Sequence, residues 1–148
     1  MTLILASGSE IRAKLLARAN VPFEVMAARV DEDAIKHALE AEGAGPRYTA
    51  DALAYMKARR VAEKRPDALV LGCDQVLDHD GAVLSKPETP EEAEAQLRAL
   101  RGKTHRLMSA AVLYEDAQPV WRHVGVVRLT MHTLSDAYIV GYVARNWD

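Results

Sequence analysis

The sequence predicts an α/β domain in which helices flank a β-sheet, and three stretches carry this prediction. The apolar run ALVL at 68–71, bounded by Pro66-Asp67 and Gly72, is typical of a strand that is buried on both faces. Residues 89–101 combine an N-terminal capping pattern with helical spacing of their apolar residues. Within residues 120–132, apolar and polar residues alternate near the end, as in a strand with one solvated face.

The composition is that of an ordinary globular domain. A chain of 148 residues, with 49% hydrophobic and 27% charged residues, suffices for one domain with a real core. The net charge of −2 gives no overall basic field that would attract nucleic acid or membranes. The single cysteine excludes an intrachain disulfide, and no stretch has the form of a transmembrane helix or signal peptide. We therefore expect a cytoplasmic protein without nucleic-acid or membrane partners.

The beginning of the chain predicts a strand, a short polar loop and a helix. The strand covers residues 3–6, and Ser9 is the expected N-cap of the helix. Backbone N–H groups at such a helix start bind phosphate, and Arg12 in the first turn would add a guanidinium. An ordinary strand-to-helix turn with a solvent-facing arginine explains the same residues. The apolar stripe of this helix comprises Ile11, Leu15, Leu16 and Ala19.

Acidic residues follow the second predicted strand at 23–26. The acids at 31–33 would supply a metal-binding or catalytic carboxylate. Alternatively, they form a solvated helix start in which Asp31 or Asp33 caps the next helix. A glycine-rich break at 43–46 ends that helix.

A long helix is predicted from Tyr48 to Lys64. Lys57 and Val61 are four residues apart and share one face, which directs Lys57 partly toward the protein interior. A solvated lysine is the alternative interpretation.

Asp74 follows the central apolar run, where it would lie at the carboxyl end of a strand. Ligands bind at these ends in open α/β sheets, so Asp74 is placed to hold a metal or activate a water. An acid that merely caps or ends the strand is the alternative.

The residues after Asp74 predict a hairpin and an extended loop. Asp78 to Gly81 form the expected turn between strands at 76–77 and 82–84. Pro87 biases Lys86 toward an extended backbone, which would aim its side chain instead of winding it into a helix. Lys86 is otherwise an ordinary loop lysine.

The helix at 89–101 has the strongest local signals. Thr89 is the expected N-cap, Pro90 stands at the first helical position, Glu92 completes a capping box, and Gly102 ends the helix. We assign this helix a structural role, away from any cleft.

The last third of the chain predicts two strands and a helix. The strands cover residues 104–114 and 120–132, and Ser135 caps the helix. His105 and His132 lack zinc-type spacing, so we assign them no metal. The residues expected inside this last helix are Ile139, Tyr142 and Val143.

Several blocks of the chain, in order, resemble the Maf family, nucleoside triphosphate pyrophosphatases once described as septum-formation inhibitors. The blocks are LASGSEIRAKLL (5–16), VDE (30–32), the helix around Lys57-Ala58, LGCDQV (71–76), LSKPETPEEA (84–93) and LRALRGKTHRLMSAAVL (97–113). The first block departs from the family's usual Ser-x-Ser-Pro-Arg-Arg, because Glu10 replaces the proline and Ile11 the first arginine.

The resemblance implies a Maf/ITPase-like fold, in which helices flank a mixed, elongated sheet with a nucleotide cleft. It implies hydrolysis of a nucleoside triphosphate to the monophosphate and pyrophosphate, with a divalent metal, Mg²⁺ or Mn²⁺, as cofactor. Glu32 and Asp74 are implied as catalytic acids and metal ligands. The implied phosphate cradle consists of Ser7, Arg12, Lys57 and Lys86. Family members usually continue with a glycine-rich segment and further strands, so we expect residues 1–148 to form a single domain without that segment.

Two positions resemble the family branch that acts on 7-methyl-GTP. Gln75 stands where the branch acting on dTTP and UTP has threonine, and Ile11 is an apolar replacement typical of the 7-methyl-GTP branch. A supporting role behind the base explains both positions as well. Three alternatives stay open: a dTTP/UTP pyrophosphatase, a nucleotide-binding regulator of septum formation or growth without turnover, and an unrelated α/β interaction module. The oligomeric state is also open, with a homodimer considered.

Overall fold

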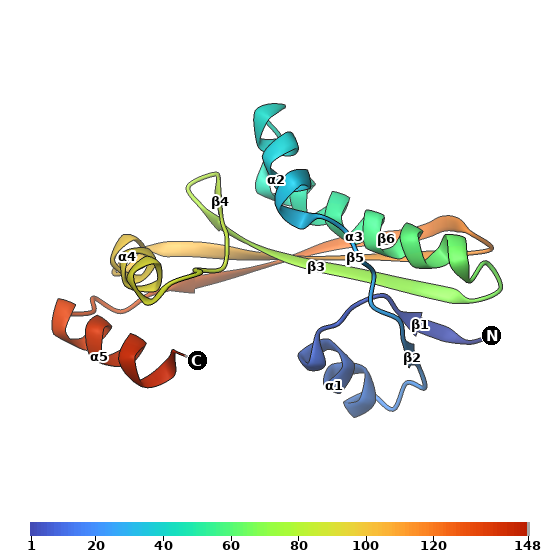
Figure 1. Cartoon of the computed structure of the whole chain (residues 1–148), viewed down its shortest axis with the longest axis horizontal. Helices are drawn as coiled ribbons and strands as arrows, with labels where there is room; N and C mark the ends of the chain where they lie inside the picture. Colours follow the sequence, from blue (N-terminus) through green and yellow to red (C-terminus); the bar gives the residue numbers. More distant parts are fainter. Residues whose placement is uncertain (148) are drawn as a thin grey trace.

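The computed structural model describes residues 1–147 and confirms the α/β class (Figure 1). Asp148, the last residue of the predicted domain, lies outside the described part. The strands among residues 1–147 are β1 (Leu3–Leu5), β2 (Glu24–Val25), β3 (Leu69–His79), β4 (Ala82–Leu84), β5 (Thr104–Glu115) and β6 (Gln118–Thr130). The helices in the same part are α1 (Glu10–Arg18), α2 (Glu32–Ala41), α3 (Pro46–Lys64), α4 (Pro90–Leu100) and α5 (Asp136–Asn146).

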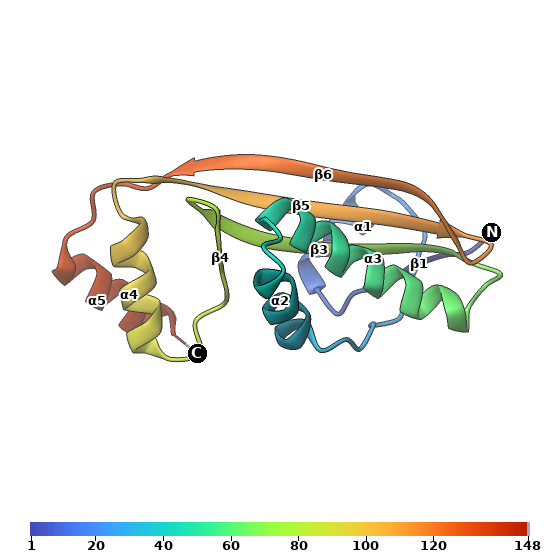
Figure 2. The same cartoon turned by 90° about the horizontal axis from the view of Figure 1, so that it is seen from above.

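The six strands form one mixed sheet, as the resemblance implied. Its order is β2-β1-β3-β5-β6, with β4 paired to β3 off this path. β1 is parallel to β2 and β3, whereas β3, β5 and β6 are antiparallel neighbours. The 13 residues of β6 span about 44 Å at the usual rise per strand residue. The long strands make the sheet elongated, and α4 and α5 lie at the end far from the N-terminus (Figure 2).

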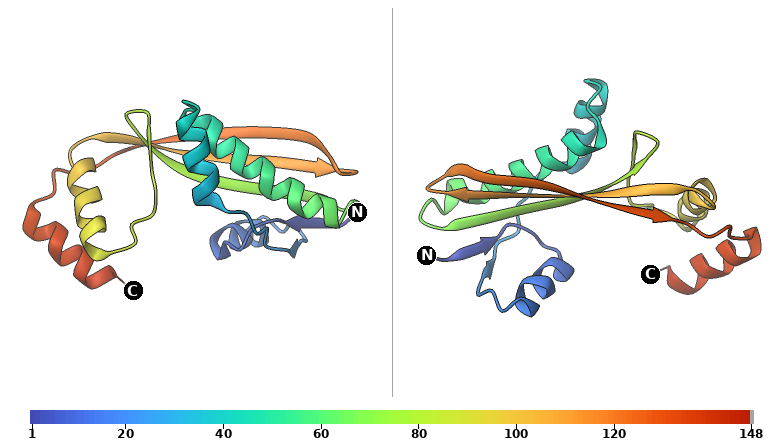
Figure 3. Two further views of the ribbon diagram at one scale, coloured as in Figure 1. Left: turned by 45° about the horizontal axis from the view of Figure 1, so that its top comes forward. Right: turned by 180° about the vertical axis from the view of Figure 1, so that it is seen from behind.

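β3 has two different partners along one of its edges. β1 pairs with residues 69–71 and β4 with residues 77–79, while β5 pairs with the opposite edge along residues 70–78. Within the described part of the chain, residues 72–76 therefore have no strand partner on the β1 side. The figures show α1 on one side of β3 and α2 and α3 on the other (Figures 1 and 3).

The core lies where α3 crosses β3 and β5. The small residues Ala50, Ala54 and Ala58 of α3 are fully buried there. A Cβ on Gly72 would lie 2.7 Å from both the Cβ and the backbone nitrogen of Ala58, and closer still to the carbonyl oxygen of Ala54. The prediction that Gly72 bounds the strand is therefore wrong. Glycine instead lets β3 pass directly beneath the helix and continue to His79.

The predicted N-caps are confirmed, whereas Glu92 does not complete the expected capping box. The N-cap side chains each accept a hydrogen bond from a backbone N–H three residues ahead; these caps are Ser9, Asp31, Thr89 and Ser135. The hairpin between β3 and β4 also forms, but its turn consists of Asp80 and Gly81 alone. Their φ angles of 50° and 86° lie in the left-handed region that a tight two-residue hairpin requires.

Several apolar residues expected on the inner faces are exposed. Ile11 and Leu15 of the α1 stripe are 72% and 60% exposed, and α1 buries no residue. Both faces of β6 are largely solvated, because the side chains of Val127 and Leu129 are exposed to solvent, as are the polar residues next to them. In α5, Ile139 and Val143 are buried as predicted, but Tyr142 is exposed.

The far end of the molecule is held by contacts between α4 and α5. Leu100 of α4 and Ile139 of α5 are buried. Asp136 at the start of α5 accepts hydrogen bonds from Arg98 and Arg101, at 3.3 and 2.7 Å. These contacts fix the position of α4 relative to α5.

No helix among residues 1–147 has both the length and the apolarity needed to cross a membrane.

Candidate active site

An open cleft of about 600 Å³ lies over the unpaired edge of β3. Asp74 and Gln75 lie on that edge, and because they are strand neighbours their side chains point to opposite faces of the sheet. Since β3 continues past Gly72 to His79, Asp74 lies inside this strand. The prediction that Asp74 lies at the carboxyl end of a strand is therefore wrong. The charged residues that line the cleft are Arg12, Glu32, Asp33, Lys36, Lys57, Asp74, Lys86 and Glu88.

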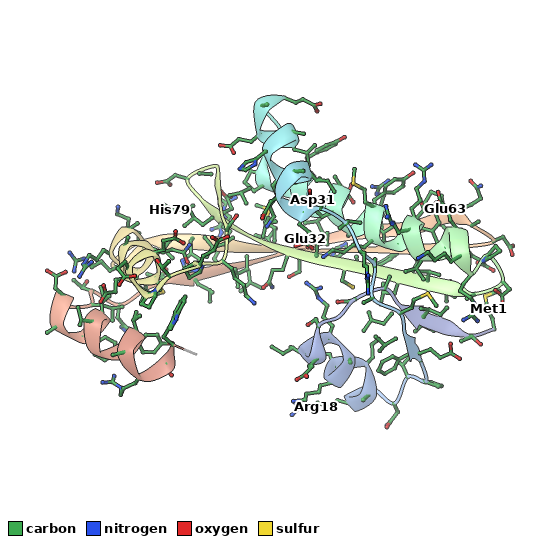
Figure 4. The ribbon with its side chains drawn as sticks, viewed as in Figure 1. Met1, Arg18, Asp31, Glu32, Glu63 and His79 are labelled. Atoms are coloured by element: carbon green, nitrogen blue, oxygen red, sulfur yellow. The ribbon has the colours of Figure 1, made fainter. Side chains whose placement is uncertain are left out.

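Lys57 links two carboxylates from different parts of the chain. Its ammonium donates a hydrogen bond of 2.9 Å to Asp74 Oδ1 and forms an ion pair with Glu32. Glu32 is the first residue of α2, at the end of this helix that points toward the centre of the view in Figure 4. The side chains of Lys57 and Asp74 are only 12% and 8% exposed, so this pair is well shielded from water. The inward direction predicted for Lys57 from its helical spacing is thus observed.

Burial and charge act in opposite directions on these three groups. Burial raises the pKa of Asp74 above its ordinary value, although the neighbouring Lys57 opposes this shift. For Glu32, burial also raises the pKa, but the hydrogen bond and charge of Lys57 outweigh it and lower the pKa. Burial alone would lower the pKa of Lys57, yet Glu32 and Asp74 raise it, so the lysine stays protonated. The site thus holds two carboxylates of unlike basicity around one ammonium.

Asp74 also carries an oxygen that no described group satisfies. Its Oδ2 is buried and has no hydrogen-bond partner in the described structure. Buried polar atoms are normally paired, so this oxygen is suited to a ligand or a metal ion. Among residues 1–147, no cluster of three or more His, Cys, Asp and Glu side chains could enclose a metal. Two carboxylates fit Mg²⁺, which is often bound by one or two carboxylates with water and substrate phosphates completing the shell.

Arg12 reaches the cleft from the first turn of α1. Its Nη1 donates to the Ser7 hydroxyl at 3.2 Å and to the carbonyl oxygen of Cys73 at 3.3 Å. The second bond uses the unpaired edge of β3. Ser7 is buried and also accepts a bond from the Ser9 N–H. Ser7 therefore lies behind Arg12 and holds it, while Ser9 and Arg12 line the cleft.

The remaining predicted residues differ in their placement. Lys86 lines the cleft from the loop after β4. Gln75 also lines it, and its amide donates a hydrogen bond of 2.8 Å to the hydroxyl of Ser109 on β5. Ile11 is exposed on α1 and is not among the residues that line the cleft. Its predicted role in base selection stays a prediction.

Residues that the sequence analysis did not single out also line the cleft. Lys36 lies one helical turn after Glu32 in α2, a spacing that places both on the same helix face. Gln96 comes from α4 and donates a hydrogen bond of 2.9 Å to the carbonyl oxygen of Ser85. The prediction that α4 lies away from the cleft is therefore wrong for this side chain. The spacing signal was available for Lys36, whereas nothing local indicated Gln96.

Comparison with known proteins shows the family of this chain. Residues 2–148 match the family described as Maf-like protein. The chain is 63% identical over 146 residues to a nucleoside triphosphate pyrophosphatase of Ruegeria pomeroyi, which covers 99% of this chain and 73% of the relative. It is 45% identical over 142 residues to a 7-methyl-GTP pyrophosphatase of Mesorhizobium japonicum, covering 96% of this chain and 71% of that protein.

A solved structure shares the fold at low sequence identity. The crystal structure of a nucleoside-triphosphatase / dITP/XTP pyrophosphatase from Mycobacterium abscessus superposes with a TM-score of 0.56 at 16% identity. The match covers 90% of this chain and 76% of that one. At this identity the likeness concerns the fold alone.

Proposed function

This chain belongs to the Maf family, and on that basis we propose that it hydrolyses a nucleoside triphosphate to the nucleoside monophosphate and pyrophosphate. The observation that carries this proposal is the shielded pair of Lys57 and Asp74, joined by the half-exposed Glu32, in a cleft that other cations border. Reactions at phosphorus depend mainly on positioning and charge neutralisation, and these residues provide both.

The charges of the cleft explain how a triphosphate would be held. Arg12, Lys57 and Lys86 approach from three different elements and would contact phosphate oxygens, with Ser7 holding Arg12 in place. Arginine is suited to bidentate phosphate contacts, and lysine acts as a point charge. The four cations that line the cleft are balanced by four acids, so the protein alone offers no excess positive charge to a triphosphate.

Because these charges cancel, we infer that the cleft needs a divalent cation to bind a triphosphate. Asp74 and Glu32 would hold Mg²⁺ or Mn²⁺, which would supply the missing positive charge and withdraw electrons from the phosphate oxygens. For such an ion to bind, Lys57 would give up part of its contact with the two carboxylates and would become free to contact phosphate.

The protein groups then account for the transfer of the proton. A water attacks the α-phosphorus, the bond from this phosphorus to the oxygen bridging to the β-phosphate breaks, and pyrophosphate leaves. Glu32 or Asp74 takes the proton of the attacking water, because both carboxylates border the cleft beside Lys57. Arg12 and Lys86 stabilise the negative charge that moves onto the pyrophosphate.

For the substrate, we propose 7-methyl-GTP in preference to dTTP and UTP. Gln75 supports this choice because it lines the cleft and its amide has both donor and acceptor groups. The Ser109 hydroxyl takes up one N–H of that amide, which holds the side chain in a defined position beside the cleft. A relative named 7-methyl-GTP pyrophosphatase further supports it, while other relatives carry the general name only.

The test is pyrophosphate release from 7-methyl-GTP, GTP, dTTP and UTP, each with Mg²⁺ or Mn²⁺ and each with EDTA. We expect release that depends on the divalent ion and is fastest with 7-methyl-GTP. Faster release from dTTP or UTP would overturn the substrate proposal only. Nucleotide binding without any release would overturn the enzymatic proposal and favour a nucleotide-binding regulator.

A further inference from the structure

We propose that Gln96 is a positioning residue, which sets the place of Lys86 by holding the loop at 85–88 against α4. This inference rests on the proposed function, in which Lys86 contacts the triphosphate. Gln96 lies ten residues beyond Lys86 in the chain, and its side chain borders the same cleft.

Two side chains of α4 bracket Lys86. Gln96 Nε2 donates a hydrogen bond of 2.9 Å to the carbonyl oxygen of Ser85, the residue before Lys86. Glu92 Oε2 accepts a hydrogen bond of 2.8 Å from the backbone N–H of Glu88, two residues after it. Glu92 and Gln96 are one helical turn apart and share a face of α4. The expected capping box is altered accordingly, because Glu92 reaches Glu88 and not the N–H of Thr89.

The loop that carries Lys86 has little other support. Residues 85–87 belong to no helix or strand, and Pro87 has no N–H to donate. The strand before the loop, β4, has three residues and pairs only with the end of β3. No hydrogen bond or ion pair of the Lys86 side chain is found within residues 1–147. The position of its backbone therefore sets the region of the cleft that the ammonium can reach.

The helix that supplies the clamp is itself anchored. Leu100 of α4 is buried, and Arg98 and Arg101 bind Asp136 of α5. α4 thus holds the loop from a fixed support outside the cleft. This arrangement gives α4 a role in the site that its capping signals alone do not indicate.

Gln96 is the better of the two residues to change. Glu92 is an acid in the first turn of α4, where its charge stabilises the helix dipole, so replacing it would also disturb the start of the helix. Gln96 lies in the last part of α4 and takes no part in a cap. Gln96→Met keeps the length of the side chain and a similar helix propensity but removes the donor. Gln118→Met is the matched control, because Gln118 begins β6 and is not among the residues that line the cleft.

The first measurement is hydrogen exchange of the Glu88 amide in the free protein, because this N–H is bound by Glu92 and opens when the loop leaves α4. We expect about three- to tenfold faster exchange of this amide in Gln96→Met, the usual weight of one neutral hydrogen bond, and no change in Gln118→Met. Unchanged exchange in Gln96→Met would overturn the clamp. This measurement needs no substrate, so it remains decisive even if the proposed function fails.

The second measurement is a double-mutant cycle in the pyrophosphate assay with Lys86→Ala. Gln96→Met alone should lower kcat/KM about three- to tenfold, with a nearly unchanged thermal midpoint. In the Lys86→Ala background, Gln96→Met should have no further effect, because the group that it positions is absent. Equal effects in both backgrounds would show that Gln96 contacts the nucleotide itself or acts elsewhere, and would overturn the positioning role.

Discussion

Gly72→Ala is the substitution that most directly connects the packing of this protein with its site. A Cβ at this position would lie 2.7 Å from the Cβ and backbone nitrogen of Ala58 and would overlap the carbonyl oxygen of Ala54. The opposing atoms are mostly backbone of α3, so no side-chain rotation can relieve the contact. The helix and the strand would have to move apart.

The expected cost follows from these contacts. Inserting one methyl group into a packed core usually costs about 1–3 kcal/mol, and the contact with backbone places Gly72→Ala near the upper end. Alanine also restricts the unfolded chain, which stabilises the folded state by about 0.4–1 kcal/mol. The net loss in the free energy of unfolding is therefore about 2 kcal/mol. For a chain of this size, that loss lowers the thermal midpoint by about 4–8 °C.

The same movement should disturb the site. Lys57 precedes Ala58 on α3, and Asp74 lies two residues after Gly72 on β3, so separating the two elements lengthens their 2.9 Å hydrogen bond. We expect pyrophosphate release to fall at temperatures where Gly72→Ala is still folded.

Thermal unfolding and the pyrophosphate assay test this reasoning against Gly125→Ala. Gly125 is also a strand glycine, but its nearest atoms would be 3.9 and 4.0 Å from an added Cβ. Gly125→Ala should therefore keep or slightly raise the thermal midpoint. If Gly72→Ala were as stable as Gly125→Ala, the close packing of α3 on β3 would not be what requires glycine at this position.

Four further predictions concern three side chains. Asp74→Asn should reduce turnover at least about a hundredfold, the usual scale for losing a general base; near-normal turnover would remove Asp74 from the mechanism. Because burial raises the pKa of Asp74, the wild type loses stability as the pH rises from the ordinary carboxyl pKa through the raised pKa of the folded protein. In metal-free buffer the thermal midpoint of Asp74→Asn should therefore rise relative to that of the wild type over this range, and a constant difference would contradict the shift. Lys86→Ala should weaken triphosphate binding in titrations, with an unchanged thermal midpoint, through lost charge neutralisation. Arg122→Lys should lower the free energy of unfolding by about 0.5–1 kcal/mol in denaturant titrations, since it breaks a partly exposed two-bond contact with Asp51; an unchanged value would show that this contact adds no stability.

Features that depend on residues within a few positions of one another could be predicted from the sequence. The four helix caps formed as predicted, because a side chain reaches a backbone N–H three residues away whatever the rest of the fold does. The hairpin turn also formed, although it is confined to Asp80 and Gly81 of the predicted stretch 78–81. The inward direction of Lys57 also followed from its spacing to Val61 on a helix. The mixed sheet and the family were predicted from the resemblance to the Maf family and not from these local signals.

Only the tertiary structure decided which distant residues meet. The extent of β3 beyond Gly72 depends on how closely α3 packs above it, and the exposure of Ile11 depends on which neighbours α1 acquires. The bond from Gln96 to Ser85 depends on where α4 lies relative to β4. Periodicity states which face of an element is apolar but not which element covers it, because that choice is made by strand pairing and close packing between segments remote in the chain. The sequence by itself therefore determined the elements and the chemical types of the cleft residues, and the pairing of β3 with β1 and β4 determined the open edge over which they meet.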